Sequence, residues 1–498
     1  MNKNDFSILA RQSPKGIVIN YSVLVYKVIK SFWILIPVFF SKNVDRIINY
    51  IIPGLIILAL VLLVISVLQF LNFKFQIKNK HFILHKGVIF KKKLSIPLER
   101  IQSVNFKQNL IHQLINITQV EIQTAGAKDV EVSIKAISRE KAEALKKHLQ
   151  EGIVGAVEQE EEEVVEAPKS KLLFKLSFLE LIKVSVSENH IKSFFAIFAI
   201  VSSLFWQFED LIKDYYSFPR LLQLYQENER IVRGSIRLIF LLSVFVILIS
   251  IVISFVRVVL KHFDQKVTVL NDGIQLSQGL FTKRDDVLKI NKIQYIAVVT
   301  NPLKLKLGIQ RVKVHQAGSA KTKAKKRIEI VGVKNAVMDS LSSLFFGNES
   351  NENKIEYKPA PYYLFKLFLF SFYTLLVLNV VLFFTVTIYT QLLVSVLLVL
   401  YIVVINLLKY KKAYFNIEDK KLIVGAGSVA TVTSIMEYYK TQNIKLVQSF
   451  IQKRRGVASV HLQTASGVIK MPQLHEKDAM ELMDLILEEV CNSKKDWI

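Results

Sequence analysis

Six blocks of mostly apolar residues interrupt this chain, and each is close to the length that crosses a bilayer. About 20 such residues in a helix span the hydrocarbon core. Along the chain they fall into three pairs. The blocks are Val23–Phe40, Ile47–Leu71, Ile191–Phe208, Ile236–Leu260, Leu367–Val386 and Leu392–Leu408. This pattern predicts a multi-pass membrane protein with six transmembrane helices in three hairpins.

The first block differs from the others because it contains Lys27 and Lys30 near its start. If the block spans the membrane, these long side chains reach back to the interface. A buried amphipathic helix stays open as the alternative for this block.

Basic residues predict the orientation of the hairpins. Lys74, Lys78 and Lys80 follow the first pair closely, and Lys409, Lys411 and Lys412 follow the third. By contrast, the 209–233 connection on the other side carries four basic and five acidic residues. Because Lys and Arg near spans mark the cytoplasmic side, we expect both termini and all polar domains in the cytoplasm.

The polar segments between the hairpins repeat three times. Shifts of 192 and 340 residues superimpose five small or polar positions of the first copy on the other two without a gap. The matched positions are Asn79/Asn271/Asp419, Gly87/Gly279/Gly427, Gln102/Gln294/Gln442, Asn116/Gly308/Gly456 and Ala125/Ala317/Ala465. Such self-similarity indicates one structural unit used three times.

The repeated positions also predict how each copy folds. Asn79 and its counterparts suit tight hairpin turns, and Asn116 and its counterparts suit a left-handed residue after a short helical turn. Alternation then places Val120 and Ile122 on one face of a strand. Amphipathic helices close the copies at Arg139–Gln150, Lys334–Phe346 and His475–Val490. The predicted class is α+β, with each hairpin followed by a small antiparallel β domain.

These features divide the chain into nine segments. They are an N-terminal cytoplasmic segment 1–22, hairpin 23–71, β domain 72–152, acidic linker 153–170, interfacial segment and hairpin 171–260, β domain 261–346, linker 347–361, hairpin 362–408 and β domain 409–498. The stretches Leu172–Lys183 and Tyr362–Lys366 are basic and apolar. Each either lies in the membrane interface or forms the first turns of the next span.

Residues of the first copy resemble the bacterial PH-like family of membrane-flanked domains. They are Gly87, Ile96–Val104 and Gln123–Gly126. The arrangement of three units and six spans is similar to the YdbT-like members of that family over nearly the whole chain. The resemblance implies that each β domain is a PH-like barrel or sandwich with a C-terminal helix. It also implies a smaller single-unit relative as a protein partner.

Catalytic chemistry finds little support in the sequence. None of the common metalloprotease, serine-hydrolase or phosphate-loop motifs is present. The single Cys491 excludes an intramolecular disulfide and any site built on several cysteines. His112, His315 and His461 do not occupy equivalent positions of the repeat, as a shared catalytic base would. We expect no enzymatic activity, no cofactor and no metal.

The charge balance points to anionic partners. The chain has 66 Lys and Arg against 41 Asp and Glu, a net charge of +25. Nucleic acid is not expected, because the lysines lack interleaved aromatic residues and a reading motif. The candidate contacts to anionic lipid headgroups are Lys91, Lys92, Lys93, Lys283, Arg284, Lys323, Lys325, Lys326 and Arg327. The alternative, that these residues are solvated and only follow the positive-inside bias, stays open.

Together these observations predict an integral protein of the bacterial plasma membrane that acts as a scaffold or binding protein. Its three cytoplasmic PH-like domains would contact protein partners and anionic lipid headgroups of the bilayer. The alternative is a membrane transport or envelope-defence component that uses the six-helix region. The polar residues inside the spans are uncharged, which weighs against an ion pathway or proton relay.

Overall fold

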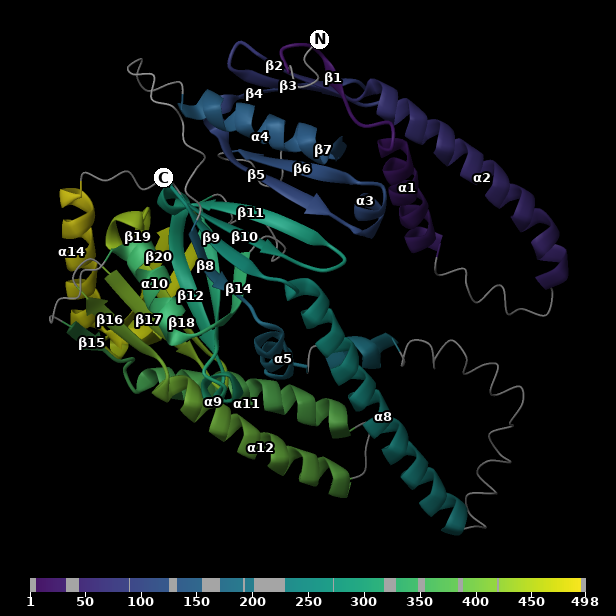
Figure 1. Ribbon diagram of the computed structural model, residues 1–498. Helices are drawn as coiled ribbons and strands as arrows, with labels where there is room; N and C mark the ends of the chain where they lie inside the picture. The colour runs from purple at the N-terminus through teal and green to yellow at the C-terminus, as the bar shows by residue number, and fades with distance from the viewer. Residues whose placement is uncertain are drawn as a thin grey trace.

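The computed structural model shows three units that repeat one order of elements (Figure 1). It describes residues 6–32, 44–88, 90–124, 132–154, 171–190, 193–200, 229–271, 273–317, 328–347, 354–383, 388–418 and 421–493. Each unit has one strand, a helical region with at least one candidate membrane span, three strands, three further strands interrupted by a short helix, and a closing helix. This order agrees with the α+β fold predicted from the repeat.

The bounds of the elements show the repeat directly. Unit 1 comprises β1 (Ala10–Arg11), α1 (Gly16–Phe32), α2 (Val44–Asn72), β2 (Lys74–Lys78), β3 (His81–Lys86), β4 (Lys92–Pro97), β5 (Ile101–Gln108), α3 (Leu110–Leu114), β6 (Ile117–Thr124), β7 (Val132–Ser138) and α4 (Arg139–Val154). Unit 2 comprises β8 (Lys171–Lys175), α5 (Phe178–Val186), α8 (Glu229–His262), β9 (Lys266–Leu270), β10 (Gly273–Gln278), β11 (Lys283–Lys289), β12 (Ile293–Thr300), α9 (Pro302–Lys306), β13 (Gln310–Gln316), β14 (Ile328–Val333) and α10 (Asn335–Phe346). Unit 3 comprises β15 (Lys354–Tyr357), α11 (Tyr362–Phe383), α12 (Ile388–Lys411), β16 (Tyr414–Glu418), β17 (Lys421–Gly427), β18 (Thr431–Glu437), β19 (Asn443–Val447), α13 (Phe450–Arg454), β20 (Val457–Thr464), β21 (Gly467–His475) and α14 (Glu476–Asn492).

Each membrane region is inserted between two strands that pair with each other. β1 pairs with β2, β8 with β9, and β15 with β16, all antiparallel. The strand that precedes each membrane region therefore becomes the edge strand of the sheet formed by the strands that follow that region. Both ends of the membrane region are fixed to one sheet.

The positions of β8 and β15 differ from two predictions made from the sequence. β15 lies inside 347–361, which the sequence assigned to a solvated linker, and β8 begins the stretch Leu172–Lys183. The rest of that stretch forms α5, whose Leu181 and Val184 are buried in the core of unit 2, while Phe178 and Leu179 are 65% and 72% exposed. Because α5 ends at Val186, before Ile191–Phe208, the stretch is not the first turns of that predicted span. For Tyr362–Lys366 the second reading is right, because these residues form the first turn of α11.

Two sheets and the closing helix enclose the core of each unit. In unit 1, Phe75 and Phe82 from the first sheet, Ile122 from the second and Leu145 from α4 are each at most 1% exposed. The buried residues alternate along the strands, as predicted for Val120 and Ile122. Burying a large apolar side chain contributes about 1.5–3 kcal/mol, so these clusters supply most of the cohesion. The packing matches the predicted sandwich closed by a helix.

The repeated glycines have a steric cause. Gly87, Gly279 and Gly427 have φ of 112°, 106° and 123°. A Cβ at any of them would lie 2.0–2.1 Å from the backbone carbonyl oxygen three residues later. The predicted left-handed residues after the short helices are also confirmed, since Asn116, Gly308 and Gly456 have φ between 52° and 66°.

The sheets continue from one unit into the next. β5 of unit 1 pairs with β11 of unit 2, and β12 of unit 2 pairs with β18 of unit 3. Two sheets of seven strands result, in the orders β7-β6-β5-β11-β10-β9-β8 and β14-β13-β12-β18-β17-β16-β15. The first four strands of unit 1 and the last three of unit 3 form separate sheets at the two ends.

Four helices of the described chain are long and apolar enough to cross a membrane. Their candidate spans are Ile52–Asn72, Ser243–His262, Tyr362–Phe383 and Ile388–Lys411. Most of their apolar side chains face outward from the protein, which requires a hydrocarbon environment. The chain is therefore a membrane protein. The two other predicted spans, Val23–Phe40 and Ile191–Phe208, extend into residues outside the described part.

Polar side chains hold the third hairpin together. The Asn406 side-chain amide donates to Ser371 Oγ (3.0 Å), and Ser395 Oγ donates to Asn379 Oδ1 (2.5 Å). Each bond joins α11 to α12. Hydrogen bonds of this kind stabilise helix pairs in lipid.

Candidate membrane-facing site

A cavity of about 670 Å³ lies where the sheets of unit 1 meet the base of its membrane helices. Its walls come from α1, α2, the turn between β3 and β4, and β7. They are Gln12, Asn20, Ile65, Gln69, Phe73, Lys86, Gly87, Val88, Phe90, Lys92, Ser133 and Lys135. The insertion of the hairpin between β1 and β2 creates this place, because it brings α2 beside the β3–β4 turn.

Three lysines converge on the cavity from different elements. Lys86 ends β3, Lys92 begins β4, and Lys135 comes from β7. The tight turn at Gly87 brings the first two together. Lys135 Nζ donates to the Asn20 side-chain oxygen (3.1 Å), so it is tied to α1. Burial lowers the pKa of Lys135, and the charge of Lys27 adds to this shift.

An unsatisfied acceptor also borders the cavity. Gln12 is only 4% exposed, and its Oε1 finds no hydrogen-bond donor among the described residues. Leaving a buried acceptor without a donor costs about 1–3 kcal/mol. A ligand that brings a hydroxyl or an ammonium group would remove this cost.

The cavity therefore offers cations, one acceptor and an apolar rim. Ile65 and Phe73 continue the apolar surface of α2 into it, and Phe90 is 81% exposed at its mouth. Phosphate groups bind to convergent ammonium groups, and a glycerol hydroxyl can donate to an amide oxygen. Acyl chains would follow the apolar side. This combination fits an anionic glycerophospholipid.

Each unit has a short helix between two strands of its second sheet. These helices are α3, α9 and α13, and the side chains of Asn109, Asn301 and Ser449 cap their first turns. All three expose apolar residues; α9 and α13 also carry basic residues, whereas His112, the basic residue of α3, is buried. The apolar residues are Leu110, Leu114, Leu303, Leu305, Phe450 and Ile451, which are 42–83% exposed.

Contacts fix α3 and α9 beside the segments that lead into the membrane regions of their units. Ile111 of α3 packs in a small cluster with Ile19 of α1. The Asn301 side chain, at the start of α9, donates to the Ser187 carbonyl after α5 (2.8 Å). The sequence predicted a short helical turn here but not its exposed apolar face. Exposed apolar tips next to basic residues suit a membrane interface.

A buried ionic cluster ties α9 to the segment before the second membrane region. Glu188 accepts a hydrogen bond from Lys304 Nζ (2.8 Å) and another from Arg311. Their side chains are 14%, 6% and 16% exposed. Burial acts to raise the pKa of Glu188, but the charges of Arg311 and Lys304 outweigh it, and the pKa is lowered.

The predicted basic residues lie in three different settings. Lys91, Lys92 and Lys93 are exposed where β4 begins, and only Lys92 lines the large cavity. Lys323, Lys325, Lys326 and Arg327 lie outside the described residues. The sequence did not single out Lys86, Lys135 or Gln12, because only the fold brings them to Lys92.

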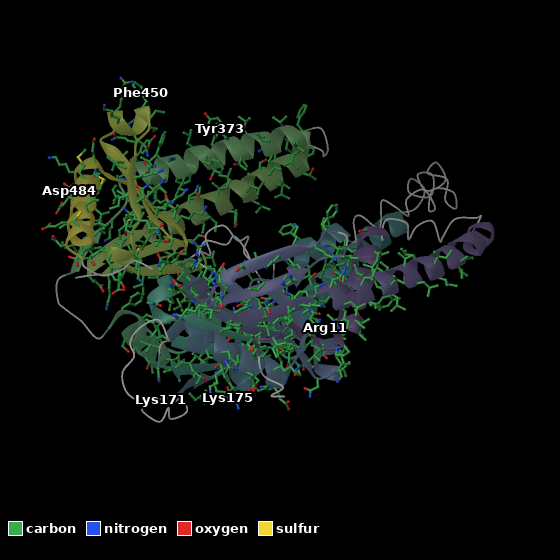
Figure 2. The ribbon with its side chains drawn as sticks, turned by 90° about the horizontal axis from the view of Figure 1, so that it is seen from above. Arg11, Lys171, Lys175, Tyr373, Phe450 and Asp484 are labelled. Atoms are coloured by element: carbon green, nitrogen blue, oxygen red, sulfur yellow. The ribbon has the colours of Figure 1, made fainter. Side chains whose placement is uncertain are left out.

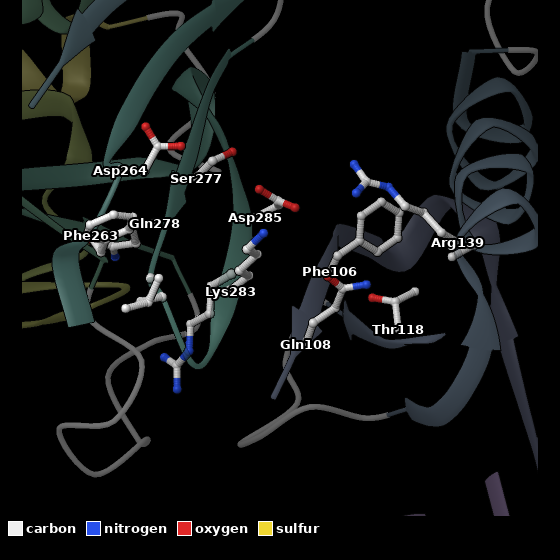
Figure 3. A pocket seen from close by; sticks show the side chains of 14 residues that line it. Phe106, Gln108, Thr118, Arg139, Phe263, Asp264, Ser277, Gln278, Lys283 and Asp285 are labelled. Atoms are coloured by element: carbon white, nitrogen blue, oxygen red, sulfur yellow. The ribbon is translucent and has the colours of Figure 1, made fainter. Parts of the chain in front are cut away.

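Lys283 and Arg284 lie at the junction of units 1 and 2 instead. Their backbones pair with β5, and both border a cavity of about 280 Å³. Figure 3 shows Phe106 and Arg139 of unit 1 facing Lys283 and Asp285 of unit 2 across it.

The same junction holds a carboxyl group of altered acidity. Burial raises the pKa of Asp286 to about 6, the charge of Arg284 opposes this, and Glu121 and Asp285 add to it. Within the described residues, no group of three or more His, Cys, Asp or Glu could hold a metal ion.

Comparisons with known proteins agree with this architecture. A family model described as "Bacterial PH domain" matches residues 33–153, 229–341 and 372–490. The transmembrane protein YdbT of Bacillus subtilis (strain 168) is 23% identical over 492 residues, which cover 95% of this chain and 95% of that protein. Each family match covers part of a membrane region together with the sheets that follow it.

Proposed function

The chain belongs to the bacterial PH domain family, and from this premise we propose that it is a non-enzymatic membrane scaffold. Its three PH-like domains would hold anionic lipid headgroups and protein partners at the cytoplasmic face of the bacterial plasma membrane. By family resemblance, a smaller single-unit relative is one such protein partner. The observation that carries the lipid part is the cavity of Lys86, Lys92 and Lys135 beside the unsatisfied Gln12.

The position of the cavity supports a lipid as its ligand. A headgroup there remains attached to acyl chains that continue along α2, whose Ile65 lines the wall. The exposed apolar residues of α3, α9 and α13 would meet the same interface. Each basic residue near an anionic leaflet contributes on the order of 1 kcal/mol, and this contribution falls off within a Debye length.

The polar residues of the third hairpin favour a scaffold over a transport pathway. Asn379 and Asn406 bond across the helix pair to Ser395 and Ser371. Their presence is explained by helix association, so they need no role in conduction.

Lipid retention tests this proposal. The full chain is purified in mild detergent with phosphatidylglycerol, and bound lipid is counted by native mass spectrometry. Neutralising Lys86 and Lys92 to Gln should lower the affinity roughly fivefold for each lysine. The matched control is Lys78→Gln with Lys80→Gln, which removes the same charge from exposed residues outside the cavity wall.

The two variants separate specific binding from general attraction. Equal retention by both would exclude the cavity as the lipid site. A further variant, Gln12→Leu, should reduce the preference for phosphatidylglycerol over phosphatidic acid, because only the former carries a free glycerol headgroup.

The native Cys491 tests the orientation without any substitution. It is the chain's single cysteine and is exposed near the end of α14. A membrane-impermeant maleimide should label it only in permeabilised cells. Labelling in intact cells would place the C-terminal domain outside and refute the cytoplasmic orientation.

A further inference from the structure

The two junctions between units share one register. At the first, β5 of unit 1 pairs with β11 of unit 2, and Gln108 lies opposite Lys283. At the second, β12 of unit 2 pairs with β18 of unit 3, and Thr300 lies opposite Thr431. The repeat shifts of 192 and 340 make Thr300 equivalent to Gln108, and both Lys283 and Thr431 equivalent to Lys91. Each unit thus offers the same strand edge to the next unit, in the same alignment.

The sheets at the two ends of the described chain each have one of the two strand edges that form such a junction, without a strand paired to it. In the described chain, β4 pairs only with β3, and β19 pairs only with β20. The sheet that ends with β4 has four strands and the sheet that begins with β19 has three. Joined edge to edge, they would complete a third sheet of seven strands like the two inside the chain.

We infer that a second copy of this chain completes that sheet, with β19 of one copy paired to β4 of the other. The shared register places Lys91 opposite Gln448, Lys92 opposite Val447 and Lys93 opposite Leu446. Exposed strand edges form such ladders readily because their backbone groups lack strand partners.

Charge at the three junctions supports this pairing. The side chains compared are the first residue of each closing helix and the strand residue equivalent to Lys93. At the first junction they are Arg139 and Asp285, which line the same cavity from opposite sides. At the second they are Asn335 and Thr433, both neutral. At the inferred junction they are Glu476 and Lys93, again opposite in charge but with the signs exchanged.

Cationic residues on β4 do not block the ladder. Lys283 and Arg284 occupy the positions of Lys91 and Lys92, and both pair with β5 inside the chain. Pro97, which lacks a backbone donor, lies beyond the five residue pairs of the longer junction. The lysines therefore disfavour unspecific partners while Glu476 offers a specific one.

Both edges are accessible. Lys92 and Lys93 are exposed, and along β19 the exposed residues alternate with half-buried ones. Figure 2 shows Phe450, just after β19, and Asp484 of α14 on the side of unit 3 that faces away from Arg11 of unit 1. In the described chain, neither β4 nor β19 pairs with a further strand on its outer side.

Pairing of this kind is head to tail. Such a contact closes into a ring if the rotation allows and otherwise extends as a row. Because every unit is anchored in the same bilayer, either assembly lies in the membrane plane. This inference rests on the partner-binding part of the proposed function and does not depend on lipid in the cavity.

Cysteine crosslinking in native membranes tests the contact. Two differently tagged chains, both carrying Cys491→Ser, are co-expressed, one with Lys93→Cys and the other with Leu446→Cys. An intermolecular disulfide should link both tags in a product of about twice the chain mass of 57.2 kDa. The register control replaces Leu446→Cys with Ile444→Cys, which should give at least fivefold less product.

A charge exchange supplies a second readout in chains that keep all the strand residues of β19. Glu476→Lys should shift the mass distribution in nanodiscs toward single chains, and adding Lys93→Glu should restore the larger assemblies. A charge exchange that fails to restore them overturns the inference. So does the absence of a two-tag product, or a Lys93→Cys adduct formed only with a smaller, different protein.

Discussion

Removing the Glu188 carboxylate should destabilise unit 2 more than any surface substitution in that unit. Glu188→Gln keeps the size of the side chain but leaves Lys304 and Arg311 as two neighbouring cations, 6% and 16% exposed. Breaking a buried ion pair by removing one partner costs about 3–5 kcal/mol. For a unit of this size, each kcal/mol lowers the midpoint of thermal unfolding by roughly 2–4 °C. The expected loss is on the order of 10 °C.

Two measurements on the full chain in detergent locate this loss. Circular dichroism gives the midpoint, and hydrogen exchange should show faster exchange in α9 and β13, which carry Lys304 and Arg311. The pKa of Glu188 is lowered from 4.5, so its contribution is complete above that value and is lost as the pH falls through the folded pKa. The difference between wild type and Glu188→Gln should therefore vanish in strong acid.

The matched control is Glu143→Gln. Glu143 pairs with Arg139 at 3.0 Å, but these side chains are 58% and 67% exposed, so the change should stay within about 0.5 kcal/mol. Adding Lys304→Met to Glu188→Gln should recover part of the loss, because it removes one stranded cation. If Glu188→Gln and Glu143→Gln shift the midpoint equally, the burial argument is wrong.

Two further outcomes follow from backbone strain and from acidity. Gly279→Ala should lower the free energy of unfolding by more than about 1–3 kcal/mol, since a Cβ there meets the Thr282 carbonyl oxygen at 2.1 Å. The control is Gly54→Ala in α2, where a Cβ meets nothing within 4 Å, so this change should be neutral or stabilising in the same thermal assay. Equal effects of the two changes would contradict the steric reason. Asp286→Asn should raise the midpoint at pH 7.5 by the equivalent of about 3 kcal/mol at most. The pKa of Asp286 is raised from 3.8 to about 6 on folding, so the cost of its ionisation builds up between these values and is complete above about pH 6. The gain should disappear below pH 4, and a gain independent of pH would point to packing instead.

The repeat predicted much of the fold because its residues act locally. Left-handed turns were predicted at Asn116, Gly308 and Gly456, and each of these residues has a positive φ. In β6, the alternation of apolar and polar residues around Val120 and Ile122 predicted which face of the strand is buried. Such features depend on neighbours within a few residues, so one sequence is enough to read them.

Three features could not be predicted from the sequence, because they depend on contacts between residues far apart along the chain. β8 reads as the basic start of a membrane helix, and only its pairing with β9, beyond the membrane region, makes it a strand. The ladders between units use backbone groups, which every residue has, so no side-chain pattern marks them. The large cavity of unit 1 joins Gln12, Lys92 and Lys135 from three parts of the fold, whereas the sequence pointed to clusters of consecutive lysines.

The insertion of each membrane region between paired strands also sets an order of events during synthesis. β8 leaves the ribosome about 90 residues before β9, an interval of roughly 5–20 s at ordinary translation rates. During that time β8 has no β9 to pair with, while the helices between them enter the bilayer. Biogenesis of each sheet is thus conditional on successful insertion, and a hairpin that fails to integrate leaves behind a domain that cannot close.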